Sequence, residues 1–394
     1  MDALARCFRW VAVIVGLLLV GEAVARFGLK LKPGPLVQHD LAESIAKYAE
    51  FDPKLGIRYK PNVDILLDSP TDDFSFLFKT NEIGLRDRPM GTHLRSEYKF
   101  LIFGDEFIEG WGTDIDETAV VRAQNAVNQR TNLKPPVRFV IVGKSGYGAA
   151  QNYLMAPALI DSLQPKGVVF FYSGLMPHAD QRFLATAKLD NGMATGVSPS
   201  AGTTPVLPHG EDYPRFKPGL LTALAPYSAG ARALAEKLAF HAMAAAIKPG
   251  DPATDRLSGM RGNTNTLQAA LAPTFSYITR LATLADQNKI PFLLIHLPLP
   301  PQVAANEWTQ GRKLFGVPDE LQPATDLSLV QNFCVAHKLR CVNAFELFQK
   351  AAKQPNAAPL YCKAELAFTP TSTKLLGAWF ADELYRWMGE LRLL

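Results

Sequence analysis

The feature that most constrains the fold of this chain is a series of short apolar runs that alternate with helical stretches. Each run is five or six residues long with at most one charged residue, as is typical of strands buried on both faces of a sheet. The runs lie at residues 98–103, 137–142, 167–172, 291–296 and 340–344, and the helical stretches lie near 117–130, 149–164, 265–288, 325–338 and 371–391. This alternation predicts an α/β fold with a central parallel sheet and helices on both of its faces.

The composition is that of a folded protein, with 48% hydrophobic and 20% charged residues among 394. The 41 basic and 37 acidic residues leave a net charge of +4, which is too small to favour binding to nucleic acid. We therefore expect no nucleic-acid partner.

An apolar run from Trp10 to Val20 lies near the N-terminus, between Arg9 and the pair Glu22 and Arg26. Together with its flanks the run has roughly the length that crosses a bilayer. Glu22 and Arg26 are four residues apart, so they can pair on one helix face and reduce the cost of charge near the membrane.

Two interpretations of this segment remain open. Residues 1–28 form an uncleaved membrane anchor, or they form a signal peptide that is cleaved after Ala23-Val24-Ala25, which fits a small-residue cleavage site. Both place the basic N-terminus in the cytoplasm and export the rest of the chain. We favour the anchor.

Three cysteines would then lie in an oxidising compartment, where disulfides form. Cys334 near the end of a predicted helix and Cys341 at the start of the next strand are the more plausible pair, and Cys362 is the third. The alternative is that all three are buried thiols.

A polar turn, Gly104-Asp105-Glu106, joins the first apolar run to the helical stretch near 117–130. The segment through Gly112 resembles the Gly-Asp-Ser-Phe-x-x-Gly-x-Gly motif of the SGNH (GDSL-type) hydrolases. Residues 51–62 and 80–86 resemble the segment that precedes this motif in the membrane-anchored bacterial branch of that family. The resemblance implies a flavodoxin-like, three-layer fold, with ligands bound at the carboxyl ends of the strands.

The resemblance divides the chain into an anchor (1–28), a linker and N-terminal extension (29–95) and an SGNH hydrolase-like domain (96–394). Pro33 and Pro35 indicate a juxtamembrane linker over residues 29–50. Residues 178–262 interrupt the alternation of strands and helices, and we interpret them as an insertion. Insertions of this length at a site are typical of a lid, a cap or a partner surface.

Enzymes of this family use a serine nucleophile, oxyanion donors from a glycine and an asparagine, and a histidine base that an aspartate orients. At the nucleophile position this chain has Glu106, which has no hydroxyl to acylate. Gly146 matches the glycine that donates to the oxyanion. The favoured explanation for a glycine here is structural, because the turn needs a residue without Cβ whether or not the chain is catalytic. The asparagine position holds Leu175, or Met176 if the alignment shifts by one residue.

In the last motif Glu365 stands where the family has its aspartate, and Ala367 stands where it has its histidine. Alanine cannot accept a proton, so the base is missing as well as the nucleophile. With three of the four catalytic side chains replaced, we expect no catalytic residues, no metal and no cofactor.

Several polar or turn residues are still expected at the strand ends and are candidate cleft residues: Asp105, Glu106, Glu109, Ser145, Gly146, His178, Asp180 and His296. Glu106 with His178 and His296 could bind a metal or act as an acid–base pair. The favoured alternative is that both histidines bond loop backbone, because no spacing motif supports a metal site.

The sequence therefore favours a non-catalytic SGNH hydrolase-like protein of the cell envelope. We expect a single pass through the bacterial inner membrane, a periplasmic main domain, and a role as a binding or assembly subunit of a membrane complex or polysaccharide pathway. Its expected partners are the membrane, a membrane protein and a glycan ligand. The alternative is an active esterase or O-acyltransferase that acts on envelope glycans through displaced residues.

Overall fold

The computed structural model describes residues 2–33, 41–69, 71, 73–91, 98–131, 133, 136–197 and 219–393. The chain divides into two compact units, which are described separately below. One comprises Met1–Asp40 with Asp212–Ala246, and the other comprises Leu41–Glu211 with Ile247–Leu394.

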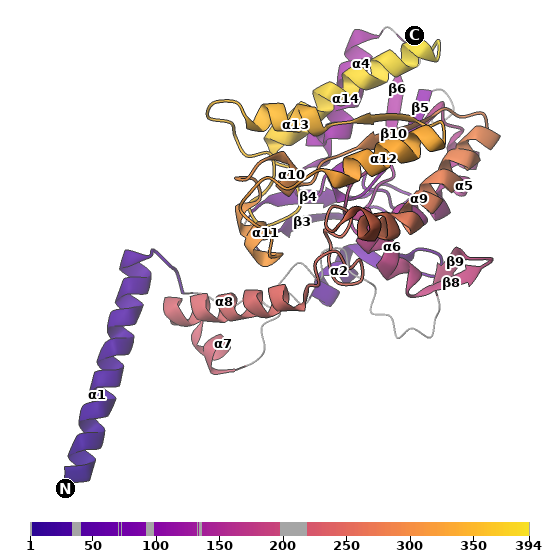
Figure 1. Ribbon diagram of the computed structural model, residues 1–394. Coiled ribbons are helices and arrows are strands. Elements are labelled where there is room, and N and C mark those ends of the chain that lie inside the picture. Colours follow the sequence, from indigo (N-terminus) through magenta and orange to yellow (C-terminus); the bar gives the residue numbers. More distant parts are fainter. Residues whose placement is uncertain are drawn as a thin grey trace. The chain divides into compact units, whose positions relative to one another are not determined.

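The larger unit is built on a parallel sheet of five strands (Figure 1). Its strands are β5 (Tyr98–Phe103), β6 (Val137–Ile141), β7 (Gly167–Tyr172), β10 (Phe292–His296) and β11 (Arg340–Asn343). They are ordered β6-β5-β7-β10-β11, which is the flavodoxin-like order 2-1-3-4-5 when these five are numbered along the chain. The predicted α/β class and the strand order that the resemblance implied are confirmed.

Helices cover both faces of the sheet, which explains why its strands are apolar on both sides. On one face α4 (Ala119–Arg130) packs with α14 (Pro370–Glu390). On the other, α9 (Thr264–Gln287) packs with α5 (Ala149–Leu163), α6 (Met176–Leu184) and α12 (Thr325–Ala336).

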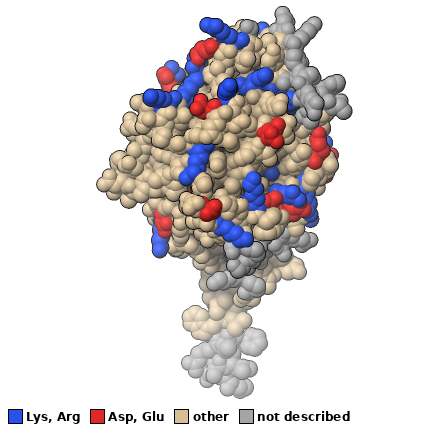
Figure 2. All heavy atoms as spheres, turned by 90° about the vertical axis from the view of Figure 1, so that its right-hand side faces the viewer, with Lys and Arg blue, Asp and Glu red and all other residues tan. Residues whose placement is uncertain are grey.

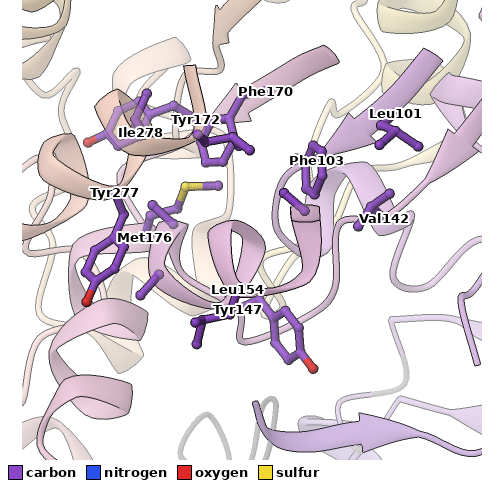
Figure 3. Packing of buried hydrophobic residues seen from close by; sticks show 14 of the residues in the cluster. Leu101, Phe103, Val142, Tyr147, Leu154, Phe170, Tyr172, Met176, Tyr277 and Ile278 are labelled. Carbon is purple, nitrogen blue, oxygen red and sulfur yellow. The ribbon is translucent and has the colours of Figure 1, made fainter. Parts of the chain in front are cut away.

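Neighbouring residues of the central strand β7 contact these two layers in turn, because successive side chains of a strand point to opposite faces. The ring of Phe171 lies 4.9 Å from that of Phe380 in α14. The ring of Tyr172 lies 6.3 Å from that of Phe275 in α9. Figure 3 shows Phe170 and Tyr172 in the apolar layer that also contains Met176, Tyr277 and Ile278.

Each predicted strand of the sheet and each helix over 117–130, 149–164, 265–288, 325–338 and 371–391 is present, with ends that differ by a few residues. The remaining elements of this unit are short: α2 (Leu41–Tyr48), α3 (Glu106–Glu109), η2 (Ile115–Glu117), α10 (Pro300–Val303), α11 (Thr309–Leu314) and α13 (Phe345–Ala352).

Three antiparallel hairpins accompany the sheet and were not predicted. They pair β1 (Ala49–Asp52) with β2 (Gly56–Tyr59), β3 (Asp64–Asp68) with β4 (Ser75–Lys79), and β8 (Ala187–Asp190) with β9 (Met193–Val197). Their strands have four or five residues each, too few for a clear period in the sequence.

The prediction of a linker over residues 29–50 is wrong for 41–50, which form α2 and the start of β1. Ile45 and Tyr48 are buried there. The ring of Tyr48 lies 4.9 Å from that of Phe78 and 5.9 Å from that of Tyr59. The prolines that precede this segment in the sequence do not prevent a helix from forming where it can bury these side chains.

The predicted insertion, 178–262, begins inside α6, which packs against α9 as part of the helical layer. The excursion therefore starts after Leu184, later than predicted. It contains β8 and β9, and residues 198–218 lie outside the described part of the chain. It continues through α7 (Leu220–Leu224) and α8 (Ala229–Ala246) and ends before α9.

The smaller unit contains α7 and α8 together with α1 (Asp2–Ala23) and the π-helical turn η1 (Val24–Gly28). One stretch of the described chain, Trp10–Gly28, is long and apolar enough to cross a membrane. A signal sequence near an N-terminus has the same properties, so the choice between anchor and signal peptide remains a prediction.

A disulfide joins Cys334, in the last turn of α12, to Cys341 in β11, with 6.2 Å between the two Cα atoms. Cys362 is a free thiol.

Candidate functional site

The turns that follow β5, β6 and β7 meet at one edge of the sheet, where ligands bind in flavodoxin-like folds. After β5 the chain turns at Gly104, and Asp105 becomes the N-cap of α3, with its Oδ1 atom accepting the N–H of Phe107 at 3.0 Å. Glu106 is therefore the first residue of a short helix, and Gly110 ends that helix in a left-handed conformation with φ of 78°.

The first two turns approach each other too closely for side chains. A Cβ atom on Gly143 would lie 2.9 Å from backbone atoms of Gly104. Asn152 of α5 also donates from its side-chain amide to the carbonyl oxygen of Gly104 at 3.1 Å. Gly143 is thus required by the packing of one backbone against another.

Glu106 forms a buried ion pair with Arg256. The guanidinium Nη2 of Arg256 donates to Oε1 of Glu106, and the two side chains are 12% and 2% exposed respectively. Arg256 belongs to the segment between α8 and α9, which also contacts the turn after β7 through a hydrogen bond from Gly259 N to Gly174 O of 3.2 Å. The residue at the position that matches the family's nucleophile, Glu106, is therefore engaged in an ion pair with Arg256.

Arg256 was not identified from the sequence. It lies 150 residues from Glu106, in a stretch without a recognisable motif, so no local signal could have indicated the pair.

Asp105 is buried, and the hydroxyl of Ser173 donates to its Oδ2 atom. Burial, with a further contribution from the negative charge of Glu106, raises the pKa of Asp105 to about 7. The hydrogen bonds from Ser173 and Phe107 act in the opposite direction. The proton of Asp105 is therefore lost near neutral pH.

Glu109 is also buried, and both the backbone N–H of Ser145, at 2.5 Å, and the Ser145 hydroxyl donate to its Oε2 atom. The neighbouring Lys144 places its ammonium 4.8 Å from the centre of the Tyr59 ring. Burial lowers the pKa of Lys144 to about 8, and the charge of Glu109 partly offsets this effect. The hydroxyl of Ser145 therefore donates to the carboxylate of Glu109, just as the hydroxyl of Ser173 donates to that of Asp105.

Gly146 adopts a positive φ of 75°, a conformation that favours glycine. Its turn borders a small, mostly apolar cavity of about 30 Å³, room for about one water. The cavity is lined by Phe51, Leu55, Gly56, Ile57, Gly146, Gln151, Ala179, Phe183, Thr186 and Val197.

The turn after β7 carries apolar side chains where the family has its asparagine. Leu175 and Met176 are both buried, so an apolar side chain occupies the position in either alignment. Nδ1 of His178 lies 2.7 Å from the carbonyl oxygen of Pro252. Asp180 accepts hydrogen bonds from Ala150 N at 2.9 Å and from the hydroxyl of Thr274 at 2.5 Å. Burial raises its pKa to about 6.

The last motif lies beside α3, because the ring of Phe368 is 4.6 Å from the ring of Phe107. Glu365 is buried and accepts a hydrogen bond from the hydroxyl of Ser69. Ala367 is buried too and presents only a methyl group. The structure therefore brings the first and last motifs together. The positions of the family's aspartate and histidine hold Glu365 and Ala367, and neither side chain is an imidazole.

His296, at the end of β10, pairs with Asp326, with 3.0 Å between Nε2 and Oδ2. Its ring packs between Tyr172 and Phe345 at 4.9 and 4.8 Å. Glu106, His178 and His296 thus contact separate partners. Within the described ranges, no three His, Cys, Asp or Glu side chains are grouped so that they could hold a metal ion.

Arg86, in the second segment that resembles the family, holds α3 in place. Its buried guanidinium donates to the carbonyl oxygens of Glu109, Gly110 and Thr113, which follow the nucleophile motif. It also lies 5.1 Å from the centre of the Phe76 ring. The role of this arginine as a support for the turn was not foreseen from the sequence.

The chain is similar to several solved structures that are named as hydrolases. A lipase/acylhydrolase from Enterococcus faecalis is 13% identical, with 73% of this chain and 94% of that chain covered and a TM-score of 0.35. A GDSL-like lipase from Bacteroides thetaiotaomicron is 16% identical (73% and 88% covered, TM-score 0.34). The esterase EstA from a Pseudoalteromonas species is 10% identical (74% and 100% covered, TM-score 0.34).

Similarity at this level says nothing about the activity of this chain. No protein-family model and no curated protein matches its sequence.

Breaking the Glu106–Arg256 pair on one side should destabilise the larger unit strongly. We expect Arg256→Met or Glu106→Leu alone to lower the free energy of unfolding by about 3–5 kcal/mol, because each leaves a buried charge without its partner. The double variant should lose less than the sum of the two. The measurement is urea unfolding of the full-length protein in detergent, followed by tryptophan fluorescence.

The matched control is Arg340→Met, which breaks an exposed ion pair with Glu390 and should cost about 1 kcal/mol or less. Additive losses in the double variant would contradict the importance of the buried pair.

The stability of the protein should depend on the protonation of Asp105. Its pKa is raised from 3.8 to about 7 in the folded state, so the folded state binds this proton more tightly than the unfolded state. The resulting stabilisation is fully present below about pH 4 and is lost as the pH rises through about 7. Asp105→Asn removes this titration, so its unfolding free energy should fall less than that of the wild type between about pH 4.5 and about pH 7.5.

The control is Asp161→Asn at an exposed position of α5, which should follow the wild type. An unchanged pH dependence in Asp105→Asn would show that Asp105 does not titrate in this range.

Proposed function

We propose that this chain is a non-catalytic, SGNH hydrolase-like protein that is anchored in the inner membrane and acts in the periplasm as a binding or assembly subunit. The observation that carries the proposal is the buried ion pair between Glu106 and Arg256. A nucleophile must be exposed to substrate, whereas here the corresponding side chain is neutralised by a residue from the same unit and is 2% exposed.

Two serine hydroxyls that bond to carboxylates of the same turn and helix support the same conclusion. Ser145 and Ser173 are both buried and donate to the buried carboxylates Glu109 and Asp105. An acyl donor could reach neither hydroxyl without displacing packed side chains. Serine nucleophiles are activated by a base that is itself in contact with substrate, and the base position of the family holds Ala367.

Export is supported by the apolar segment Trp10–Gly28 and by the disulfide between Cys334 and Cys341, since disulfides persist in oxidising compartments. On the face of the molecule shown in Figure 2, Lys and Arg side chains are interspersed with Asp and Glu. Such a mixed surface is not what nucleic-acid binding requires.

A binding or assembly role is supported by the turns at the carboxyl edge of the sheet. Turns that lie at a ligand-binding edge in related architectures are kept, while the groups that would perform chemistry are replaced or buried. A membrane protein complex or a polysaccharide pathway of the envelope is the setting that we propose for this role.

Purified full-length protein should neither hydrolyse p-nitrophenyl acetate nor be labelled covalently by a fluorophosphonate probe. The physical reason is that the hydroxyls of Ser145 and Ser173 are buried and donate to carboxylates. Mass spectrometry of the probe-treated protein is the measurement, with Ser145→Ala and Ser173→Ala as matched variants. Labelling that disappears in one of these two variants would overturn the non-catalytic assignment.

The full-length protein extracted from native membranes in mild detergent should co-purify with a membrane protein in a defined ratio. The reason is that a subunit without chemistry of its own acts through the proteins that it holds. The measurement is size-exclusion chromatography with mass spectrometry, and an unrelated single-pass protein from the same membranes is the control. A strictly monomeric, partner-free protein would contradict the assembly role.

A further inference from the structure

Glu22 lies inside the apolar segment that could cross a membrane, and its carboxylate is fully engaged. Arg26, four residues later, donates from Nε to Oε1 of Glu22 at 2.5 Å. The other donors come from the start of α8: the hydroxyl of Ser228 at 2.7 Å, Ala229 N at 2.8 Å and Gly230 N at 3.1 Å. A carboxylate near hydrocarbon is costly unless it is paired and hydrogen-bonded in this way.

These bonds attach the first turn of α8 to the end of the apolar segment. The backbone N–H groups at the start of a helix have no partners within the helix, and a carboxylate stabilises them. Arg26 adds a bond from Nη2 to the carbonyl oxygen of Tyr227 at 2.6 Å. Ala25 and Ala229 are both buried here. If Trp10–Gly28 crosses the bilayer, α8 must begin at its boundary.

Large apolar side chains are exposed along α7 and α8. Leu234 and Leu238 are one helical turn apart and are 47% and 54% exposed, so they share one side of α8. Arg232 and Glu236 form an ion pair at 2.8 Å and lie roughly 200° around the helix from these leucines. Three further side chains of the same segment are exposed: Leu220, Leu224 and Tyr227.

We propose that α7 and α8 lie in the headgroup region of the lipid bilayer, with Leu234 and Leu238 directed toward the acyl chains. This inference rests on the membrane anchor of the proposed function. The argument is one of continuity, because α8 starts at residues bonded to the last two turns of the apolar segment. It carries exposed leucines on one side and an ion pair on the other, and the exposed Lys237 lies between the two sides. Such helices bind in the plane of the interface, and a tyrosine such as Tyr227 is typical of that depth.

We favour the bilayer over a protein as the partner of the exposed leucines. The hydrogen bonds of Glu22 attach the start of α8 to the apolar segment, and therefore to the membrane if that segment crosses it. A helix of 18 residues that begins there extends about 27 Å from that point. In the headgroup region α8 places its leucines against the acyl chains and its ion pair among polar groups, and the long side chain of the exposed Lys237 can reach the lipid phosphates.

Site-directed spin labelling of the full-length protein in lipid nanodiscs tests the proposal. Labels are placed by Leu234→Cys and Leu238→Cys in a background with Cys7→Ser and Cys362→Ser. We expect high collision rates with molecular oxygen, which partitions into lipid, and low rates with the aqueous reagent Ni-EDDA. Leu321→Cys is the matched control, since Leu321 is 51% exposed in the larger unit and should show the opposite pattern.

A label at Val15→Cys, in the apolar helix, separates the two ways to fail. If Val15 reports lipid while Leu234 and Leu238 behave as Leu321 does, the anchor stands and the lipid contact of α8 is wrong. If all four positions report water, the anchor itself is wrong. Labels at Leu234 and Leu238 that are shielded from both reagents would overturn the proposal in favour of a protein contact.

Glu22→Ala tests the attachment of α8 to the span. It removes the acceptor of three hydrogen bonds from the start of α8 and should raise the Ni-EDDA accessibility of a label at Leu234 several-fold, because a helix cap is lost. Glu236→Ala, which breaks the ion pair on the polar side, is the control and should leave that accessibility unchanged. Equal effects of the two variants would show that Glu22 does not hold α8 at the membrane.

Discussion

The ion pair between Glu106 and Arg256 is the interaction on which the arrangement of the candidate site depends. Two charges that leave water are tolerated only when each has its partner, so the pair ties the segment before α9 to the turn after β5. The backbone bond between Gly259 and Gly174 holds the same segment against the turn after β7. As a result, the segment before α9 contacts two of the turns at the edge where this architecture usually binds a ligand.

The motifs that resemble a hydrolase persist because most of their residues serve the backbone. Gly143 allows two turns to touch, Gly104 leaves room for Ile108 of α3, and Arg86 donates hydrogen bonds to carbonyl groups at the end of α3 and after it. These constraints hold whether or not a reaction takes place. A serine or a histidine at the positions of Glu106 and Ala367 would have no such structural role, so the fold does not require either residue there.

The five strands of the sheet and five long helices could be predicted because each has a local signature, an apolar run or a helical period. The hairpins and α2 could not, since what stabilises them is contact with distant residues, as when Tyr48 packs on Phe78. The site was predicted in part. The replaced positions Glu106, Leu175 and Ala367 follow from alignment of motifs, whereas the partner of Glu106 does not.

The sequence by itself determined the α/β class, the apolar N-terminal segment and the absence of a serine and a histidine at the positions where the resemblance requires them. These properties depend on residue type and on spacing along the chain. Only the tertiary structure decided that Arg256 pairs with Glu106 and that Ser173 donates to Asp105. The same holds for the carboxylate of Glu22, which accepts a hydrogen bond from the first turn of α8. Each of these contacts joins segments more than 60 residues apart, and charge pairing and burial are properties of position in space.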